Sequence, residues 1–147
     1  MTDQSKNQSA FTPAEIAYMQ SQRLGRLATV GANGQPHVVP VNFRYNPETD
    51  TIDIGGHLGF AKRKKWRDAQ HNPRVAIVID DLVTEPTRTV RGIEIRGEVE
   101  LLSTGGQTIV PTFDSEMFRL HPTRIASWGI DTGPYAPANA RSITTNP

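Results

Sequence analysis

The sequence predicts a small antiparallel β-barrel with short helices attached. The first observation is a set of about six apolar or β-branched runs of strand length, which recur along the 147 residues. The second is that these runs are joined by tight turns rich in glycine, asparagine and proline. The third is that only two or three segments carry helix signals. Close-turned strands with few helices favour a mainly β, barrel-like domain, and this length fits one domain with a sizeable core.

A helix is predicted near the start of the chain. Thr12 to Glu15 forms a capping box with Pro13 at the first helical position, and the helix should end near Gln22. Residues 1–11 are expected to be a disordered tail. Its first ten residues are polar and lack the apolar stretch of a secretory signal.

Three strands in a meander should follow, over residues 24–30, 37–45 and 51–54. Asn33-Gly34 favours a tight hairpin between the first two, and Gly55-Gly56 closes the third. Pro40 interrupts the second run, and because proline cannot donate to a ladder it implies an edge or a bulge. Two interpretations remain: an ordinary edge strand, or a strand whose free backbone groups at Val39 and Val41 meet a flat ring.

The most charged stretch follows the third strand, and we name it the cation cluster. A helix should run from here to Asn72, because Pro73 stops it. Cations in the first turns oppose the helix dipole, by roughly 0.3–1 kcal/mol each when exposed. Such placement fits a phosphate-bearing ligand, because helix N-terminal amides with Arg and Lys bind phosphate. A solvated helix face is the other interpretation. The cluster comprises Lys62, Arg63, Lys64, Lys65 and Arg67.

The second half of the chain reads as further strands. Residues 75–79 are continuously apolar, which suits a strand covered on both faces, and residues 80–89 look like a loop. Residues 93–101 alternate apolar and charged, with Gly97 marking a bulge. A short helix is expected over 112–120, a final strand over 123–128, and an irregular tail over 131–147.

Composition excludes several classes of function. A net charge of +1 argues against general nucleic-acid binding, which usually needs a strongly basic domain. The absence of cysteine excludes disulfides, thiolate metal sites and a cysteine nucleophile, and is compatible with a cytoplasmic location. No apolar run is long enough to span a membrane. The four histidines are scattered, so no metal site is expected, and no Gly-x-Ser-x-Gly elbow is present.

Four segments together resemble a known family. The opening hairpin, the cations followed by Pro73, and two later strands resemble the pyridoxamine 5′-phosphate oxidase-like split-barrel flavoproteins. The later strands look like the actinobacterial branch that uses the deazaflavin coenzyme F-420. The resemblance covers residues 12–130 and rests on residues 23–30 with 34–41, 63–65 with 73–76, 91–97 and 122–129.

This resemblance implies a six-stranded antiparallel split β-barrel of the FMN-binding kind over residues 12–130, and a homodimer with cofactor grooves between the protomers. Arg63 and Lys65 match the positions that hold the cofactor phosphate, with Lys64 close by. The remaining matched positions are Val39, Pro40 and Val41, behind the tricyclic ring; Gly56 and His57, in the loop before the cations; and Trp128, near where the partner closes the groove. From sequence alone, Trp128 is more typical of a core or interface residue.

The function implied is that of an oxidoreductase in which reduced F-420 passes a hydride to a small conjugated or quinone-like acceptor. The chemistry belongs to the cofactor, so no catalytic side chain is expected. Alternatives are the same fold using FMN, or a non-catalytic protein that sequesters the deazaflavin. Lys62 and Arg67 favour the deazaflavin, because it carries an acidic oligoglutamate tail. The substrate-binding segment of true pyridoxamine phosphate oxidases is not found in residues 133–147, where residues 139–141 are instead a candidate for contact across a dimer.

Overall fold

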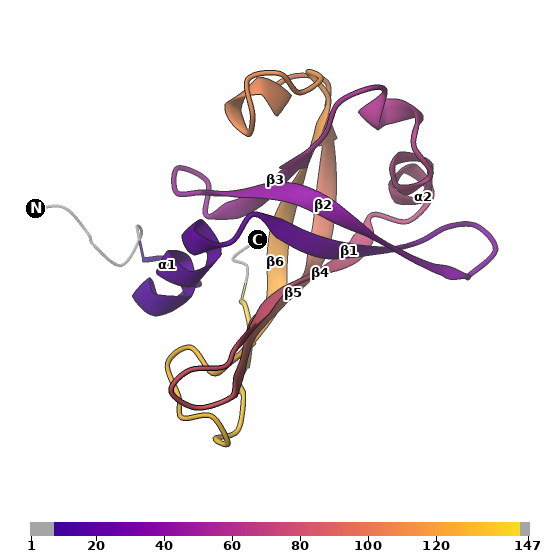
Figure 1. Cartoon of the computed structure of the whole chain (residues 1–147). Coiled ribbons are helices and arrows are strands. Elements are labelled where there is room, and N and C mark those ends of the chain that lie inside the picture. The colour runs from indigo at the N-terminus through magenta and orange to yellow at the C-terminus, as the bar shows by residue number, and fades with distance from the viewer. Residues whose placement is uncertain (1–7, 145–147) are drawn as a thin grey trace, which may run out of the picture.

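The computed structural model describes residues 8–144 and contains a closed antiparallel barrel (Figure 1). The order of its seven strands is β3-β2-β1-β4-β5-β6-β7, and a further pairing of β3 with β6 closes the first six into a barrel. The predicted six-stranded barrel is confirmed. The strands are β1 (Leu24–Val30), β2 (Pro36–Asn46), β3 (Thr51–Gly55), β4 (Arg74–Val83), β5 (Thr89–Leu102), β6 (Met117–Trp128) and β7 (Asn139–Ser142).

All five residues of β3 are buried, whereas strands such as β1, β4 and β5 fill the barrel interior from alternate positions. β5 shows this most clearly, because Ile93, Ile95 and Val99 are buried while Arg96 and Glu98 are exposed. Such alternation is the pattern expected of a sheet with one apolar and one wet face. The bulge predicted at Gly97 is confirmed by a register shift against β6 between Arg96 and Gly97.

The β1–β2 hairpin forms as predicted and leaves part of β2 with a neighbour on one side only. Gly34 takes a positive φ of 77°, and its amide donates to the carbonyl of Gly31. β2 pairs with β1 over residues 36–42 but with β3 only over residues 42–46. Pro40 therefore lies in a part of β2 that has a neighbouring strand on one side only. Its missing N–H breaks no hydrogen bond to β3 there.

Residues 80–83 and Thr89 are in strands, so the loop predicted over 80–89 was wrong for these positions. β4 continues to Val83 and β5 begins at Thr89, with Leu82 directly opposite Val90. In the sequence, Asp80 and Asp81 look like a solvated strand end. Asp81 is instead bonded by the Arg91 guanidinium across the ladder, at 2.7 and 3.0 Å. A cross-strand ion pair of this kind lets a charged residue remain in a strand.

The helix predicted over residues 112–120 was also wrong. A single 3-10 turn, η3 (Gly106–Thr108), is followed by β6, which starts at Met117. The side chains of Phe118 and Leu120 are completely buried in the barrel, and both residues pair with β3. Closure of the barrel by two neighbouring strands outweighs the weak local helix signal.

The two flanking segments are more ordered than the sequence indicated. Residues 139–142 form β7 against β6 of the same chain, so the tail is not irregular there. The Arg141 guanidinium bonds Glu15, whose side chain is completely buried. Near the N-terminus, the amide of Ala10 donates to Asp50 and Phe11 is buried, so residues 9–11 are not a disordered tail. The prediction for residues 1–7 lies outside the described residues.

Two α-helices complete the described part of the chain. α1 (Pro13–Ser21) has the predicted capping box, in which Thr12 and Glu15 bond each other reciprocally. A 3-10 turn, η2 (Phe60–Lys62), leads into α2 (Lys64–His71), whose C-cap is Asn72, directly before Pro73 as predicted. No helix within residues 8–144 is long and apolar enough to cross a membrane.

Candidate functional site

Aromatic packing fixes the cation cluster against the barrel. The ring of Trp66 stacks on Phe118 of β6, with centroids 5.3 Å apart and planes 12° apart. Phe60 meets both rings edge-on, at centroid distances of 5.8 and 5.1 Å. Phe60 and Phe118 are buried, so η2 and the first turn of α2 are held by core contacts. The cations that project from this segment therefore start from a rigid backbone.

The loop between β3 and the cation cluster is held by Asp114. Its carboxylate accepts hydrogen bonds from the amides of Gly59 and Phe60, at 3.0 and 2.8 Å. The Phe60 amide is the main cause of the lowered pKa of Asp114, since the hydrogen bond favours the ionised form. The amide of Asp114 donates to the carbonyl of Gly56, and the His57 ring meets Phe113 edge-on. Gly56 and His57, both predicted site residues, thus belong to a fixed loop beside the cations.

Lys64 is neutralised by a buried carboxylate. Its ammonium donates to both oxygens of Asp68, at 2.9 and 3.1 Å, and Thr29 donates to one of them at 2.9 Å. Burial opposes ionisation of Asp68, but the bonds from Lys64 and Thr29 outweigh it and lower its pKa. Lys64 therefore connects α2 to β1, and the role predicted for it near a phosphate stays a prediction.

Arg63 and Lys65 have no carboxylate partner among the described residues. The Lys65 ammonium lies 5.1 Å from the centroid of the Phe60 ring, and the Arg63 guanidinium makes only a long 3.5 Å bond to the carbonyl of Leu58. Burial and then the charge of Arg63 lower the pKa of Lys65. Two neighbouring cations that repel each other are an arrangement that a bound anion would stabilise.

The N-terminus of α2 adds unpaired backbone donors to these cations. Arg63 is the N-cap and provides no side-chain cap, and the first turn contains no acidic residue. The first intrahelical bonds reach Arg63 from Trp66 and Arg67, so the amides of Lys64 and Lys65 have no acceptor among the described residues. Free amides beside two cations without carboxylate partners would suit phosphate or another compact anion, and we name this group of residues the anion site. The phosphate-binding role of Arg63 and Lys65 stays a prediction.

The free edge of β2 begins where the loop to the anion site leaves β3. The last β2–β3 pair is Asn42 with Gly55, after which the chain turns away through Gly56 toward the cations. The side chains of Val39 and Val41 pack into the core, whereas Pro40 is exposed. What β2 offers a ligand here is therefore a strip of backbone and the proline ring, which suits a flat ligand better than a charged one.

Trp128 lies away from the other predicted residues on the same chain. Its indole covers Gly92, where an added Cβ would lie 2.5 Å from Trp128 Cζ2. It stands ten positions beyond Phe118 along β6, which corresponds to roughly 33 Å at about 3.3 Å per residue. Trp128 thus lies at the far end of β6 from Phe118, the residue on which Trp66 of the cation-bearing helix stacks.

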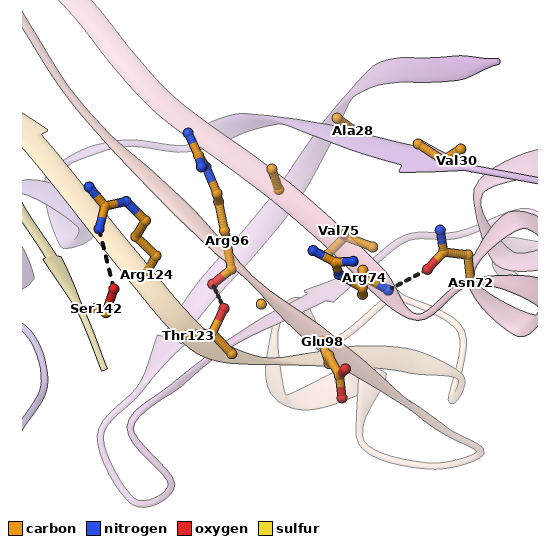
Figure 2. A pocket seen from close by; sticks show the side chains of 12 residues that line it. Ala28, Val30, Asn72, Arg74, Val75, Arg96, Glu98, Thr123, Arg124 and Ser142 are labelled. Carbon is orange, nitrogen blue, oxygen red and sulfur yellow. Dashed lines mark hydrogen bonds between the residues drawn. The ribbon is translucent and has the colours of Figure 1, made fainter. Parts of the chain in front are cut away.

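A second concave region was not predicted from the sequence. It is an open hollow of about 630 Å³ on the outer face of the barrel, and we name it the outer hollow (Figure 2). None of the predicted site residues lines it. Sequence reasoning missed it because its residues come together only through the register of five strands. Its lining is formed by Ala28, Val30, Asn72, Arg74, Val75, Ala76, Arg96, Gly97, Glu98, Thr123, Arg124 and Ser142.

Comparisons with known proteins agree with the fold and add a relative of known activity. The family model described as pyridoxamine 5′-phosphate oxidase matches residues 11–129. The chain is 43% identical over 134 residues to the 5a,11a-dehydrotetracycline/5a,11a-dehydrooxytetracycline reductase of Streptomyces rimosus subsp. rimosus, covering 91% of this chain and 94% of that protein. This relative supports an oxidoreductase.

Solved structures with low sequence identity share the fold. A heme binding protein from Mycobacterium smegmatis has a TM-score of 0.66 at 17% identity, covering 92% of this chain and 60% of that one. A FAD-binding protein from Mesorhizobium loti has a TM-score of 0.57 at 21% identity, covering 76% and 87%. These likenesses show the barrel architecture alone. The family model and the Streptomyces relative go further, and both confirm the predicted kinship: the chain belongs to the pyridoxamine 5′-phosphate oxidase family.

Proposed function

We propose that this protein is an oxidoreductase that uses the reduced deazaflavin coenzyme F-420 to reduce a small conjugated or quinone-like acceptor. The observation that carries the proposal is the anion site at the start of α2. There Arg63 and Lys65 lack carboxylate partners and the amides of Lys64 and Lys65 lack acceptors. A coenzyme phosphate supplies the charge and the acceptor oxygens that these groups lack.

The residues present fit a phosphate-bearing coenzyme with a flat ring. Arg63 and Lys65 would bind the phosphate, and the loop through Gly56 and His57 would lie against the linker. The edge of β2 at Val39, Pro40 and Val41 would support the ring. When bound, the coenzyme supplies the hydride, and the protein's part is to bind, orient and shield it.

A homodimer is part of this proposal. Trp128 stands roughly 33 Å along β6 from the aromatic residues that hold the cation cluster. Trp128 can therefore close a coenzyme groove only on a second copy of the chain. The ring would then lie between two protomers, with the acceptor on its exposed face.

One observation favours the deazaflavin over FMN as the coenzyme, and a second favours a conjugated compound as the acceptor. Lys62 and Arg67 also lack carboxylate partners among the described residues, and Arg67 donates only to the carbonyl of Lys62, at 2.8 Å. These extra cations suit the acidic oligoglutamate tail of the deazaflavin. The reductase from Streptomyces acts, by its name, on a conjugated polycyclic compound, which supports an acceptor of this kind here. A cytoplasmic location stays an expectation, based on the cysteine-free composition.

The test is a titration of the purified protein with F-420 and with FMN in parallel, followed through the fluorescence of its two tryptophans. We expect saturable quenching by F-420 at concentrations where FMN has no effect. Tighter binding of FMN than of F-420 would indicate that the protein is an FMN-dependent enzyme instead. Turnover of reduced F-420 is then measured with 5a,11a-dehydrotetracycline and with simple quinones. Tight coenzyme binding without turnover of any acceptor would indicate a sequestering protein.

A further inference from the structure

The outer hollow is produced by one row of residues that crosses the sheet in register. Ala28 of β1 stands opposite Ala76 of β4, and Ala76 stands opposite Arg96 of β5. Arg96 in turn stands opposite Arg124 of β6, which is opposite Ser142 of β7. Directly opposite residues share a face of the sheet. Two adjacent alanines therefore leave a shallow floor, and two adjacent arginines form a wall beside it (Figure 2).

The arginine pair places two like charges next to each other on one face of the sheet. Like charges directly opposite each other on neighbouring strands are destabilising. Arg96 uses only Nε, in a 3.1 Å bond to Glu94, and Arg124 uses only Nη1, in a 3.3 Å bond to the hydroxyl of Ser142. Each guanidinium carries five N–H groups, so most of these donors have no acceptor among the described residues. The pair is thus arranged to bind anionic oxygens.

The remaining walls make the hollow amphipathic. Val30 and Val75 add apolar surface next to the alanine floor. Arg74 stands directly opposite Glu98 at the far end of the hollow, so the positive and negative charges of this pair compensate each other there. Glu94 balances part of the charge of Arg96, so the positive charge without a carboxylate partner among the described residues is concentrated at Arg124.

We propose that the outer hollow binds the acceptor as an organic anion. Its carboxylate or enolate oxygens would be held by Arg96 and Arg124, and its flat apolar body would cover Ala28 and Ala76. This deepens the proposed function, on which it rests, by naming the chemical class of the acceptor. About 630 Å³ lies within the range of pockets that take drug-sized ligands. Val38 stands opposite Ala28, which places the floor one strand from the predicted ring-binding segment of β2.

The experiment uses 2-naphthoate as probe and 2-naphthamide as its neutral isostere, titrated by calorimetry into the full chain. We expect naphthoate to bind at least tenfold more tightly than naphthamide. The double variant Arg96→Ala/Arg124→Ala should lose this preference. Arg88→Ala is the control for loss of an exposed arginine, because it removes one guanidinium from the exposed loop between β4 and β5 and should leave both affinities unchanged. Ala76→Phe fills the floor and should weaken both probes, with circular dichroism confirming that each variant folds.

The outcomes separate this inference from the proposed function. The double variant should bind F-420 as the unchanged protein does, because neither arginine lies in the cation cluster. A loss of F-420 affinity would mean that these arginines bind the acidic coenzyme tail, and would overturn the acceptor assignment. Absence of naphthoate binding to the unchanged protein, or equal affinity for naphthamide, would overturn the site itself. If sedimentation shows that Ala76→Phe dissociates an oligomer, a second copy covers the hollow and the assignment is wrong. If the unchanged protein prefers naphthoate but does not bind F-420, the proposed function fails and the bound anion is no longer its acceptor, whereas the anion-binding hollow itself stands.

Discussion

Replacement of Lys65 by methionine tests the anion site directly, because methionine keeps an apolar stem over Phe60 and removes only the ammonium. The Lys65 ammonium lies 5.1 Å from the Phe60 centroid and has no carboxylate partner among the described residues. Loss of one hydrogen bond to a charged group costs about 1.5–3 kcal/mol. Since about 1.4 kcal/mol is a factor of ten, F-420 should bind about 10- to 150-fold more weakly.

The same substitution should change the alkaline pH dependence of stability. Burial and the charge of Arg63 lower the pKa of Lys65 below its ordinary value of 10.5. Between the lowered pKa and 10.5, the unfolded chain binds more protons than the folded one, so stability rises with pH in that window. Below the folded pKa the unfavourable charge is fully present. Lys65→Met should therefore remove part of the rise seen for the unchanged protein.

The assay is fluorescence titration with F-420, together with urea unfolding of the ligand-free protein between pH 8 and 10.5. Lys62→Met is the comparison variant, because Lys62 is an exposed neighbour in the same cluster that we assign to the acidic tail and not to the phosphate, so its loss should weaken binding less. The reasoning is refuted if Lys65→Met and Lys62→Met weaken coenzyme binding equally, or if Lys65→Met leaves the affinity unchanged.

Three further predictions test the fold. In Gly97→Ala, the new Cβ would overlap the carbonyl oxygen of His121, so thermal unfolding should show a loss of about 1–3 kcal/mol, whereas Gly133→Ala, with open space around it, should show none. Arg141→Ala leaves the carboxylate of Glu15 buried without its cation and should cost about 3–5 kcal/mol in urea unfolding; a loss below 1 kcal/mol would contradict this. Burial raises the pKa of Glu15, but the hydrogen bonds from Arg141 and Ser127 outweigh it and hold the pKa below 4.5. The stability that Glu15 contributes is therefore present above pH 4.5 and lost as pH falls through the folded pKa. As the pH is lowered through this range, the urea midpoint of Glu15→Gln should fall less steeply than that of the unchanged protein.

Local signals in the sequence were sufficient for much of the fold. The capping box at Thr12, the Asn33-Gly34 turn and the bulge at Gly97 each depend on neighbouring residues, and each was predicted correctly. The strand from Met117 was not, because Phe118 and Leu120 are placed by pairing with β3, more than sixty positions earlier. Long-range pairing of this kind leaves little trace in a local window.

The candidate site divides in the same way. The cation cluster is contiguous in the sequence and could therefore be predicted. The sequence also contained a signal that would have divided the cluster. Asp68 follows Lys64 by four positions on a helix, a spacing typical of ion pairs, and it separates Lys64 from the unpaired cations. The outer hollow could not be foreseen, because Ala28, Ala76, Arg96 and Arg124 meet only once four strands are in register.

The pairing of β6 with both β5 and β3 has a consequence during synthesis. Until residues 117–128 leave the ribosome, β3 and β5 each expose an unpaired edge. Open strand edges are templates for pairing with other chains, and contacts between distant segments form slowly. The nascent chain should therefore be most prone to aggregation just before β6 emerges, and slower translation of that stretch would lengthen the dangerous interval.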